Sequence, residues 1–366
     1  MKTLELFAIA CMACSITSVT AQTNHLVAAN QIITKPDGNG YASAVLPDGK
    51  ILVGGNSPGK TSANLTVVRY NKKGAVDKGF GLHGKAIARF GGNATANSIA
   101  LQPDGKIIAA GTGNDDLAVA RFNADGSIDS SFGKNGKIKR DFEGYQDAIN
   151  KLILQPDNKI LAVGYGFESN HETTKIILMR FNPDGSFDDS FGEGGFTAVR
   201  VNENGFDYAW SALLQQDGKI LVAGYSYTNS AFDFTLTQFT SNGKVDSAYG
   251  TNGHIYTDIS GFDLARTMAV QSNGKIVVAG YSDFFNGKFV LARYTKAGLP
   301  DSSFGPNGKI ITAVGSIDDK AYSVAIQPDD KIVVAGYSYN GSNRDLALVR
   351  YNKNGARIKV SALTAK

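Results

Sequence analysis

The stretch Gln102-Pro-Asp-Gly-Lys106-Ile-Ile-Ala-Ala-Gly111 decides how this chain folds, because versions of it occur six times. All six copies keep the lysine, the isoleucine after it and the closing glycine; the other five begin at Leu46, Gln155, Gln215, Gln271 and Gln327. Their lysines lie 56, 53, 60, 56 and 56 residues apart. Internal repetition at such a period indicates an array of similar structural units.

Each copy of this phrase joins two short apolar runs through a turn. In the second unit the runs are 98–101 and 106–110, with Asp-Gly between them. Asp-Gly between apolar runs is a strong β-hairpin signal. A third run, 117–122, and a fourth, 137–142, follow after a loop and a Gly-rich turn. The sequence therefore predicts units of four antiparallel strands.

Strands this apolar need cover on both faces of their sheet. A single four-stranded sheet cannot provide it, so neighbouring units must stack on one another. Four-stranded units repeating every ~40 to 50 residues are typical of β-propeller blades. The six slightly longer units predict an all-β fold, a six-bladed β-propeller with four antiparallel strands per blade. No segment shows the capped 3.6-residue period of a helical solenoid.

The sixth unit lacks a fourth strand in the usual place. Near the N-terminus, Gln31-Ile-Ile-Thr34 matches Lys309-Ile-Ile-Thr312, the fourth run of the fifth unit, and lies at a similar distance before the next phrase lysine. We predict that this N-terminal strand closes the ring and so removes two exposed sheet edges. Residues 22–355 then form the propeller. Ala356–Lys366 is left as either a rival closing strand or a tail.

The first 21 residues have the pattern of an export signal. A basic residue precedes an apolar run that ends at Cys14, and small residues lead up to Ala21, as at a signal-peptidase site. Cleavage after residues 1–21 predicts an exported bacterial protein that is periplasmic, at the cell surface or secreted. Lipidation at Cys11 is the alternative. Both cysteines fall in the leader, so the exported chain is expected to have no disulfide and no thiol chemistry.

Composition limits the classes of partner. The 366 residues carry 37 Lys and Arg against 33 Asp and Glu, and a surplus of +4 is too small for the basic surface of a nucleic-acid binder. The apolar fraction of 42% is ample for a buried core. Beyond the leader, no stretch approaches the ~18 apolar residues of a membrane span. We expect a monomer with no nucleic-acid partner and no integral membrane span.

The repeat resembles a known family. Gln-Pro-Asp-Gly-Lys-Ile, then Arg-Phe-Asn-x-Asp-Gly-Ser-x-Asp-x-Ser-Phe-Gly and a Gly-Lys, are seen best at 102–137 and 155–195. This combination is similar to the delta-60 repeat family of bacterial β-propellers, and the likeness spans residues 30–355. It implies an exported or surface propeller without an assigned activity and transfers no catalytic residues. Gln238, Tyr249 and the shortened last unit depart from the pattern.

Three residue types recur in the second half of the units. They are Arg69, Arg121, Arg180, Arg293 and Arg350; Asp77, Asp129, Asp188 and Asp301; and Phe80, Phe132, Phe191 and Phe304, with Tyr249 in the fourth unit. We predict an ion pair within each blade, or an arginine bonded to turn carbonyls, and an aromatic anchor between blades. A residue needed in nearly every repeat solves a folding problem common to all of them.

Two turns, Asn123–Asp129 and Asn182–Asp188, resemble fragments of calcium loops. The equivalent turns at 71–77 and 295–301 lack the middle acid, so all four are predicted to be Asx and glycine turns. The histidines show no ligand spacing. We therefore expect no cofactor and no metal, and calcium is the alternative.

The candidate ligand residues vary between units at places that a ligand could reach. In a propeller the first strand of each blade lines the central channel. Nine residues before each phrase lysine stand the residues that we call the inner column: Tyr41, Asn97, Asn150, Trp210, Arg266 and Tyr322. Three residues before four of these stand carboxylates: Asp147, Asp207, Asp263 and Asp319. Such a set suits a sugar or peptide. The alternative is that the aspartates cap turns and the aromatic residues only fill the channel.

No motif identifies a reaction, so we predict an exported, non-catalytic binding or scaffold module whose ligand, a glycan or a peptide, binds at the channel mouth. Trp210, the only tryptophan, is the predicted stacking platform. One alternative is a glycan hydrolase or lyase that uses the four aspartates; it needs carboxyls about 5 to 10 Å apart, one with a raised pKa. Another is surface adhesion through the loops at 165–174 and 225–234.

Overall fold

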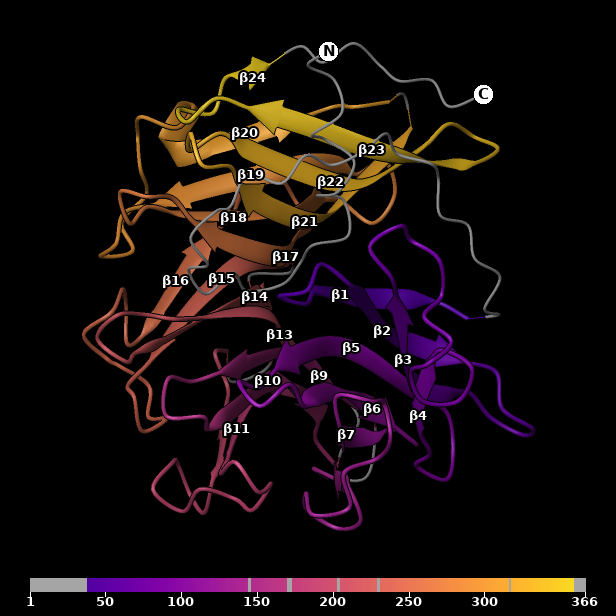
Figure 1. The fold of residues 1–366 in the computed structure, drawn as a ribbon. Helices are drawn as coiled ribbons and strands as arrows, with labels where there is room; N and C mark the ends of the chain where they lie inside the picture. Colours follow the sequence, from indigo (N-terminus) through magenta and orange to yellow (C-terminus); the bar gives the residue numbers. More distant parts are fainter. Residues whose placement is uncertain are drawn as a thin grey trace. The chain divides into compact units, whose positions relative to one another are not determined.

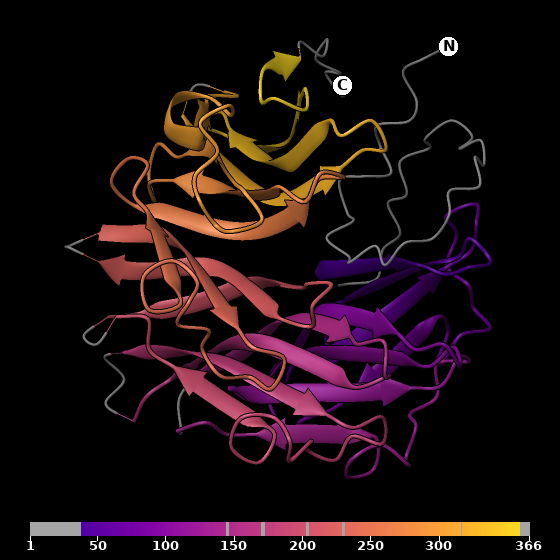
Figure 2. The ribbon, with the colours of Figure 1, turned by 90° about the vertical axis from the view of Figure 1, so that its left-hand side faces the viewer.

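The computed structural model describes residues 38–143, 146–169, 173–202, 205–228, 231–315 and 317–358. These residues form six antiparallel sheets of four strands each, and each sheet keeps its strands in chain order (Figures 1 and 2). The predicted signal at 1–21 and the closing strand Gln31–Thr34 lie outside the described residues, and both stay predictions.

The strands are named here once. Sheet 1 holds β1 (Gly40–Val45), β2 (Ile51–Ser57), β3 (Asn64–Tyr70) and β4 (Lys85–Ala88), and sheet 2 holds β5 (Ala94–Leu101), β6 (Ile107–Gly113), β7 (Asp116–Phe122) and β8 (Lys137–Arg140). Sheet 3 holds β9 (Asp147–Leu154), β10 (Ile160–Phe167), β11 (Thr174–Phe181) and β12 (Phe196–Val199), and sheet 4 holds β13 (Asp207–Leu214), β14 (Ile220–Thr228), β15 (Ala231–Phe239) and β16 (His254–Thr257). Sheet 5 holds β17 (Asp263–Val270), β18 (Ile276–Ser282), β19 (Lys288–Tyr294) and β20 (Lys309–Thr312), and sheet 6 holds β21 (Asp318–Ile326), β22 (Ile332–Tyr339), β23 (Arg344–Tyr351) and β24 (Arg357–Ile358). A short 3₁₀ turn, η1 (Pro306–Gly308), precedes β20.

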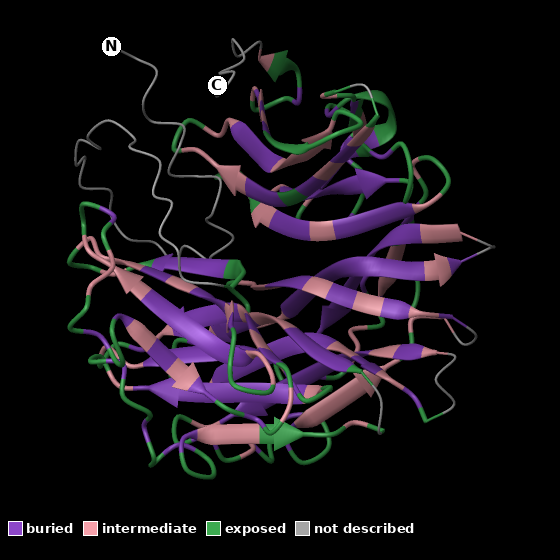
Figure 3. Cartoon of the chain, turned by 90° about the vertical axis from the view of Figure 1, so that its right-hand side faces the viewer, coloured by how far each residue is buried: buried purple, intermediate pink, exposed green. Residues whose placement is uncertain are grey.

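The chain divides into two compact units, which are described separately. Among the described residues, the first unit holds 38–220 and Phe239–Lys244, and the second holds Leu221–Gln238 and 245–358. In both units the buried residues run along the strands (Figure 3). One core joins sheets 1 and 2, another joins sheets 2 and 3, and in the second unit a third joins sheets 5 and 6.

The repeated phrase forms the turn between the first two strands of each sheet, as predicted. In sheet 2, Gln102 N donates to Lys106 O at 2.9 Å, and Gly105 has a φ of 84°. The left-handed region suits glycine, and asparagine and aspartate tolerate it better than other residues. Accordingly, the two phrases without this glycine place Asn158 and Asp330 there, with φ values of 63° and 60°.

A β-bulge interrupts the first strand of sheets 1, 2, 3, 5 and 6. The residues passed over by the pairing are Tyr41, Asn97, Asn150, Arg266 and Tyr322, which are five of the six inner-column residues. A bulge leaves one residue unpaired, increases the local twist and re-aims its side chain. In these five sheets the inner-column residue is therefore the bulged residue of its strand.

The glycine that closes each phrase lies opposite the bulge. A Cβ added to Gly280 would lie 2.0 Å from Leu264 O, and one added to Gly164 would lie 1.8 Å from Ala148 O. No side chain fits at that distance from a backbone carbonyl, which explains the closing glycine at positions 55, 111, 164, 280 and 336.

We expect Gly280→Ala to lower the free energy of unfolding by about 3 kcal/mol, because β17 and β18 must move apart at the bulge. The matched control is Gly79→Ala, where a Cβ would meet only Asp77 Oδ1, at 3.5 Å. Urea denaturation followed by circular dichroism measures both variants. Equal small effects would contradict the close approach.

Sheet 6 ends differently from the other sheets. β24 pairs Ile358 with Arg350 and Arg357 with Tyr351, so part of 356–366 is strand. In sheet 5 the pair equivalent to Tyr351–Arg357 is Tyr294–Pro300, which forms only an isolated bridge. The fourth strand of sheet 5, β20, instead pairs with Phe289–Ala292. Leu346, the equivalent of Phe289, is 86% exposed. Along 346–349, this edge of β23 has no strand partner among the described residues.

Candidate functional site

The recurrent arginines join neighbouring sheets. Arg180 Nε donates to Asp188 Oδ2 at 2.5 Å, its Nη1 donates to Ser241 O at 2.7 Å, and its guanidinium lies 4.6 Å from the centroid of the Phe191 ring. Lys159, from the phrase, lies 2.9 Å from the same Asp188 oxygen. The same contacts join Arg69, Arg121 and Arg293 to Asp77, Asp129 and Asp301 and to the carbonyls of Ala124, Pro183 and Lys353. The two predicted roles, ion pair and carbonyl clamp, are both confirmed.

The recurrent phenylalanines pack against a glycine in the turn of the following sheet. A Cβ on Gly185 would lie 2.8 Å from ring carbons of Phe132, and one on Gly243 would lie 2.6 Å from Phe191 Cζ. The predicted aromatic anchor between sheets is therefore confirmed. In sheet 4, Tyr249 is buried at the same place, and burial raises the pKa of its hydroxyl.

The sixth repeat, which forms sheet 6, lacks the aspartate that pairs with the recurrent arginine in four other repeats. Ile358 stands eight residues after Arg350, where the other repeats place aspartate. Arg350 Nε is buried and has no hydrogen-bond partner among the described residues. The departure noted in the sequence thus leaves one arginine without its usual carboxylate.

The turns that resemble calcium loops are closed by their own hydrogen bonds. Asp125 Oδ1 accepts bonds from both the backbone N and the Oγ of Ser127, at 2.8 and 2.7 Å. Asp184 accepts the same pair from Ser186. These are Asx turns, as predicted for these segments.

Low pH should weaken the ion pairs that Asp188 forms with Arg180 and Lys159. Burial alone would raise the pKa of Asp188, but hydrogen bonds from Lys159, Ser190 and Arg180 outweigh it and hold this pKa below the ordinary 3.8. The unfolded chain therefore takes up a proton before the folded chain does, and stability is lost as the pH falls below about 4. We expect Asp188→Asn to be less stable at pH 7 and to lose less stability on acidification, measured by thermal unfolding between pH 7 and 2. A parallel decline of both proteins would contradict this.

The four predicted carboxylates are buried. Asp147, Asp207, Asp263 and Asp319 are 1%, 0%, 0% and 2% exposed. Each accepts a backbone N–H from the segment after the fourth strand of the preceding sheet, from Phe142, Val201, Ile259 and Val314 respectively. These are turn-cap hydrogen bonds, the alternative given above. Burial also raises the pKa of Asp147 to about 7 and that of Asp263 to about 6.

Asparagines of the inner column link successive first strands in the first unit. Asn97 Nδ2 donates to Ile149 O at 3.1 Å, and Asn150 Nδ2 donates to Ala209 O at 2.8 Å. Each amide thus reaches the residue just before the next inner-column position. Tyr41, in sheet 1, is 54% exposed.

Trp210 belongs to a group of five half-buried aromatic residues in the first unit, which we call the aromatic patch: Tyr165, Phe167, Phe206, Tyr208 and Trp210. The ring of Tyr165 lies 4.7 Å from that of Tyr208 and 6.4 Å from that of Trp210, between centroids. Phe206 stacks on Tyr208 at 6.4 Å and meets Phe167 at 6.3 Å. Alternate residues of a strand point to one face, which is why positions 206, 208 and 210 gather there.

In the second unit the inner column is a cluster of cation–π contacts. The Arg266 guanidinium lies 5.6, 5.4 and 5.8 Å from the ring centroids of Tyr225, Tyr281 and Tyr322. Arg266 Nη2 also donates to the Tyr281 hydroxyl at 2.7 Å. The structure therefore brings Asn97 near Asn150, and Arg266 near Tyr322. That all six residues face one channel stays a prediction.

No helix formed by the described residues is long and apolar enough to cross a membrane.

Solved structures share the fold at low sequence identity. A protein from Lactobacillus plantarum is 12% identical, with a TM-score of 0.53 over 87% of this chain and 86% of that chain. A protein of unknown function from Dyadobacter fermentans is 10% identical, with a TM-score of 0.53 over 86% and 95%. A PL25 polysaccharide lyase, an ulvan lyase bound to -[GlcA(1-4)Rha3S]-, is 11% identical, with a TM-score of 0.53 over 89% and 82%. No curated protein matches the chain.

At these identities the solved structures show the fold alone. A family described as "Domain of unknown function (DUF5122) beta-propeller" matches the chain at six places, together more than half of its length: 46–80, 102–132, 155–191, 215–249, 271–304 and 327–357. Each match begins at a copy of the repeated phrase. The predicted all-β propeller class with four-stranded sheets is confirmed, and the chain belongs to this β-propeller family.

Proposed function

We propose that this protein is an exported, non-catalytic β-propeller that binds a glycan through the aromatic patch, with an extended peptide as the second ligand class. The observation that carries the proposal is a set of half-buried rings in which the Tyr165 centroid lies 4.7 Å from that of Tyr208 and 6.4 Å from that of Trp210. Aromatic rings offer flat apolar faces to the C–H faces of a sugar, and their polar edges fix its orientation.

The amides of the inner column supply polar groups in the same unit. Asn97 and Asn150 each use an Nδ2 hydrogen on a backbone carbonyl, and each is only half-buried. An amide has two Nδ2 hydrogens and a carbonyl with two lone pairs, and although Asn97 Nδ2 also donates to Asn150 Oδ1 at 3.5 Å, the two side chains together keep capacity for sugar hydroxyls. The proposed site therefore combines a stacking surface with neutral hydrogen-bonding groups.

The hydrolase or lyase alternative depends on Asp147, Asp207, Asp263 and Asp319. Their burial and their hydrogen bonds to backbone N–H groups favour a structural role. The raised pKa values of Asp147 and Asp263 follow chiefly from burial, and both groups lie at most 1% exposed, out of reach of a polymer chain. The likeness to an ulvan lyase concerns the fold only, so we favour binding without catalysis.

Export and the finer family assignment are part of the same proposal. The leader at 1–21 supports a periplasmic, cell-surface or secreted protein, and the motif at 102–137 supports membership of the delta-60 repeats. We propose a monomer. Adhesion through the loops at 165–174 and 225–234 is compatible with a surface location.

A combined glycan and peptide array, probed with the exported chain (22–366), tests the proposal. We expect saturable binding to a subset of glycans with no change in their length. Binding to peptides alone would move the proposal to its second ligand class. Shortened glycans would favour the hydrolase or lyase. An array with no bound ligand would contradict the proposal.

A further inference from the structure

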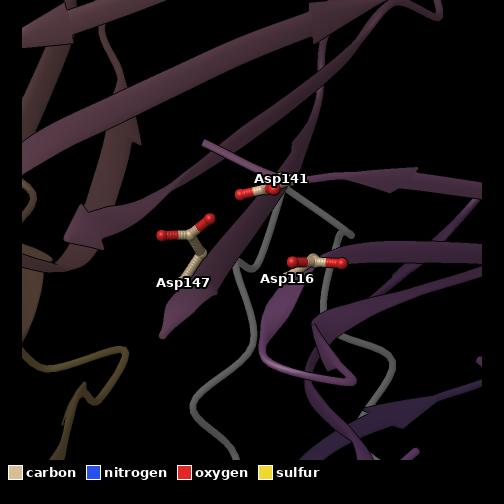
Figure 4. A group of neighbouring side chains, drawn as sticks. All are labelled: Asp116, Asp141 and Asp147. Carbon is tan, nitrogen blue, oxygen red and sulfur yellow. The ribbon is translucent and has the colours of Figure 1, made fainter. Parts of the chain in front are cut away.

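Two groups of three aspartates occupy equivalent places in the repeat. The first triad is Asp116, Asp141 and Asp147 in the first unit, and the second triad is Asp233, Asp258 and Asp263 in the second unit. Within each triad, one oxygen from each carboxylate lies within 4.8 Å of the other two. Figure 4 shows the three carboxylates of the first triad turned toward a common space. The members come from the third strand, from the end of the fourth strand and from the start of the next sheet.

Other sheets carry basic residues at these places. Counting by the repeat, the equivalents include Arg89 after β4, Lys175 with Arg200 in sheet 3, and Lys288 at the start of β19. In the first triad, Lys139 Nζ lies 2.5 Å from Asp116 Oδ2. Carboxylates held this close repel one another unless protons or cations compensate the charge.

The second triad has less compensation from the protein. Asp233 accepts the Thr228 hydroxyl and interacts electrostatically with Lys309, but neither contact is a close ion pair like that of Lys139 with Asp116. Lys309 is the nearby cation, but its Nζ donates to the backbone carbonyl of Asp258. Three carboxylates and one ammonium leave a net charge of −2, the charge that a single divalent cation cancels.

Asp263 gives a second, independent observation. Its side chain is fully buried, and its Oδ2 accepts the N–H groups of Ile259 and Ser260 at 2.6 and 2.9 Å. Its Oδ1 has no hydrogen-bond partner among the described residues. A buried carboxylate oxygen without a donor carries a large desolvation cost, and a bound cation is one way to remove it.

We propose that the second triad is a Ca²⁺ site in which Asp263 Oδ1 is the buried ligand. Hard cations prefer carboxylate oxygens, and ligands about 2.4 Å from one Ca²⁺ lie at most ~5 Å from each other, which the 4.8 Å limit satisfies. Asp258 is exposed and lines an open surface hollow with Thr257 and Lys309, so one carboxylate of the triad is in contact with solvent. This site shares no residue with the aromatic patch and does not depend on the proposed function.

Isothermal titration of the exported chain with CaCl₂ tests the site. We expect a Kd on the order of 0.1 to 1 mM, the range of extracellular calcium modules, and a Tm that rises with added Ca²⁺. Asp263→Asn keeps one oxygen for the backbone cap and removes the charge, and Asp258→Asn changes an exposed residue. Each should weaken binding at least tenfold, whereas Asp189→Asn, an exposed aspartate outside both triads, should not.

If Asp263→Asn fails to fold, the affinity of Asp258→Asn for Ca²⁺ decides whether the second triad is the site. Unchanged affinity in Asp258→Asn would overturn the proposal, as would the absence of binding heat up to about 10 mM CaCl₂. Binding that disappears only in Asp116→Asn would place the ion at the first triad and would overturn it too.

Discussion

Arg180→Met is expected to lower the free energy of unfolding by about 3 kcal/mol, the low end of the range for breaking a buried ion pair. The methionine side chain still covers the Phe191 ring, but the bonds to Asp188 Oδ2 and Ser241 O are lost. The side chains of Arg180 and Asp188 are only 10% and 7% exposed, so water cannot replace these bonds. Lys159 remains beside Asp188 and still compensates its charge, which is why the expected loss of unfolding free energy is not larger.

Arg89→Met is the matched control, because Arg89 is an exposed arginine outside this network. Urea denaturation at pH 7 should separate the two variants by more than 2 kcal/mol, since surface substitutions usually cost less than about 0.5 kcal/mol. Equal losses would mean that the recurrent arginine does not hold neighbouring sheets together.

Trp210→Ala is expected to weaken glycan binding at least tenfold, or ~1.4 kcal/mol, because interface energy concentrates in a few aromatic residues. The Trp210 ring lies beside that of Tyr165, so its loss removes one ring of the aromatic patch. Trp210→Phe keeps a ring there and should retain part of the affinity. Titration calorimetry with the best glycan from the array measures all three proteins.

Phe285→Ala provides the control for ligand binding. Phe285 is an aromatic residue that is 81% exposed, and it lies in the second unit, outside the aromatic patch. We expect its affinity to equal that of the wild type. An equal loss of glycan affinity in Trp210→Ala and Phe285→Ala would show that nonspecific hydrophobic contact, rather than the aromatic patch, is responsible for binding.

The sequence predicts the strands well because the signals are local. Asp-Gly turns and apolar runs predict the four strands of sheet 2, and β5, β6, β7 and β8 lie where those runs do. The recurrent Arg, Asp and Phe positions also predict contacts correctly, since the repeat presents the same geometry four times. The sequence left open whether arginine binds an acid or a carbonyl; a guanidinium has enough donors to do both.

The candidate site is harder to predict because it depends on register between strands. The bulges at five inner-column residues cannot be seen in one strand alone, although the glycine opposite each bulge, such as Gly280, is a usable signal. The aromatic patch needs β10 and β13 side by side, and only the alternation at 206, 208 and 210 hints at it. The capping role of Asp147 and its equivalents depends on backbone N–H groups from the segment after the fourth strand of the preceding sheet.

The central claim is that a glycan contacts the aromatic patch, and the fluorescence of Trp210 tests it most directly. Trp210 is the only tryptophan in the chain, so its emission reports on that place alone. Titration with the glycan selected on the array should produce a saturable shift or quench, with the same midpoint as the calorimetric titration. Calorimetric binding with an unchanged emission spectrum would contradict the claim.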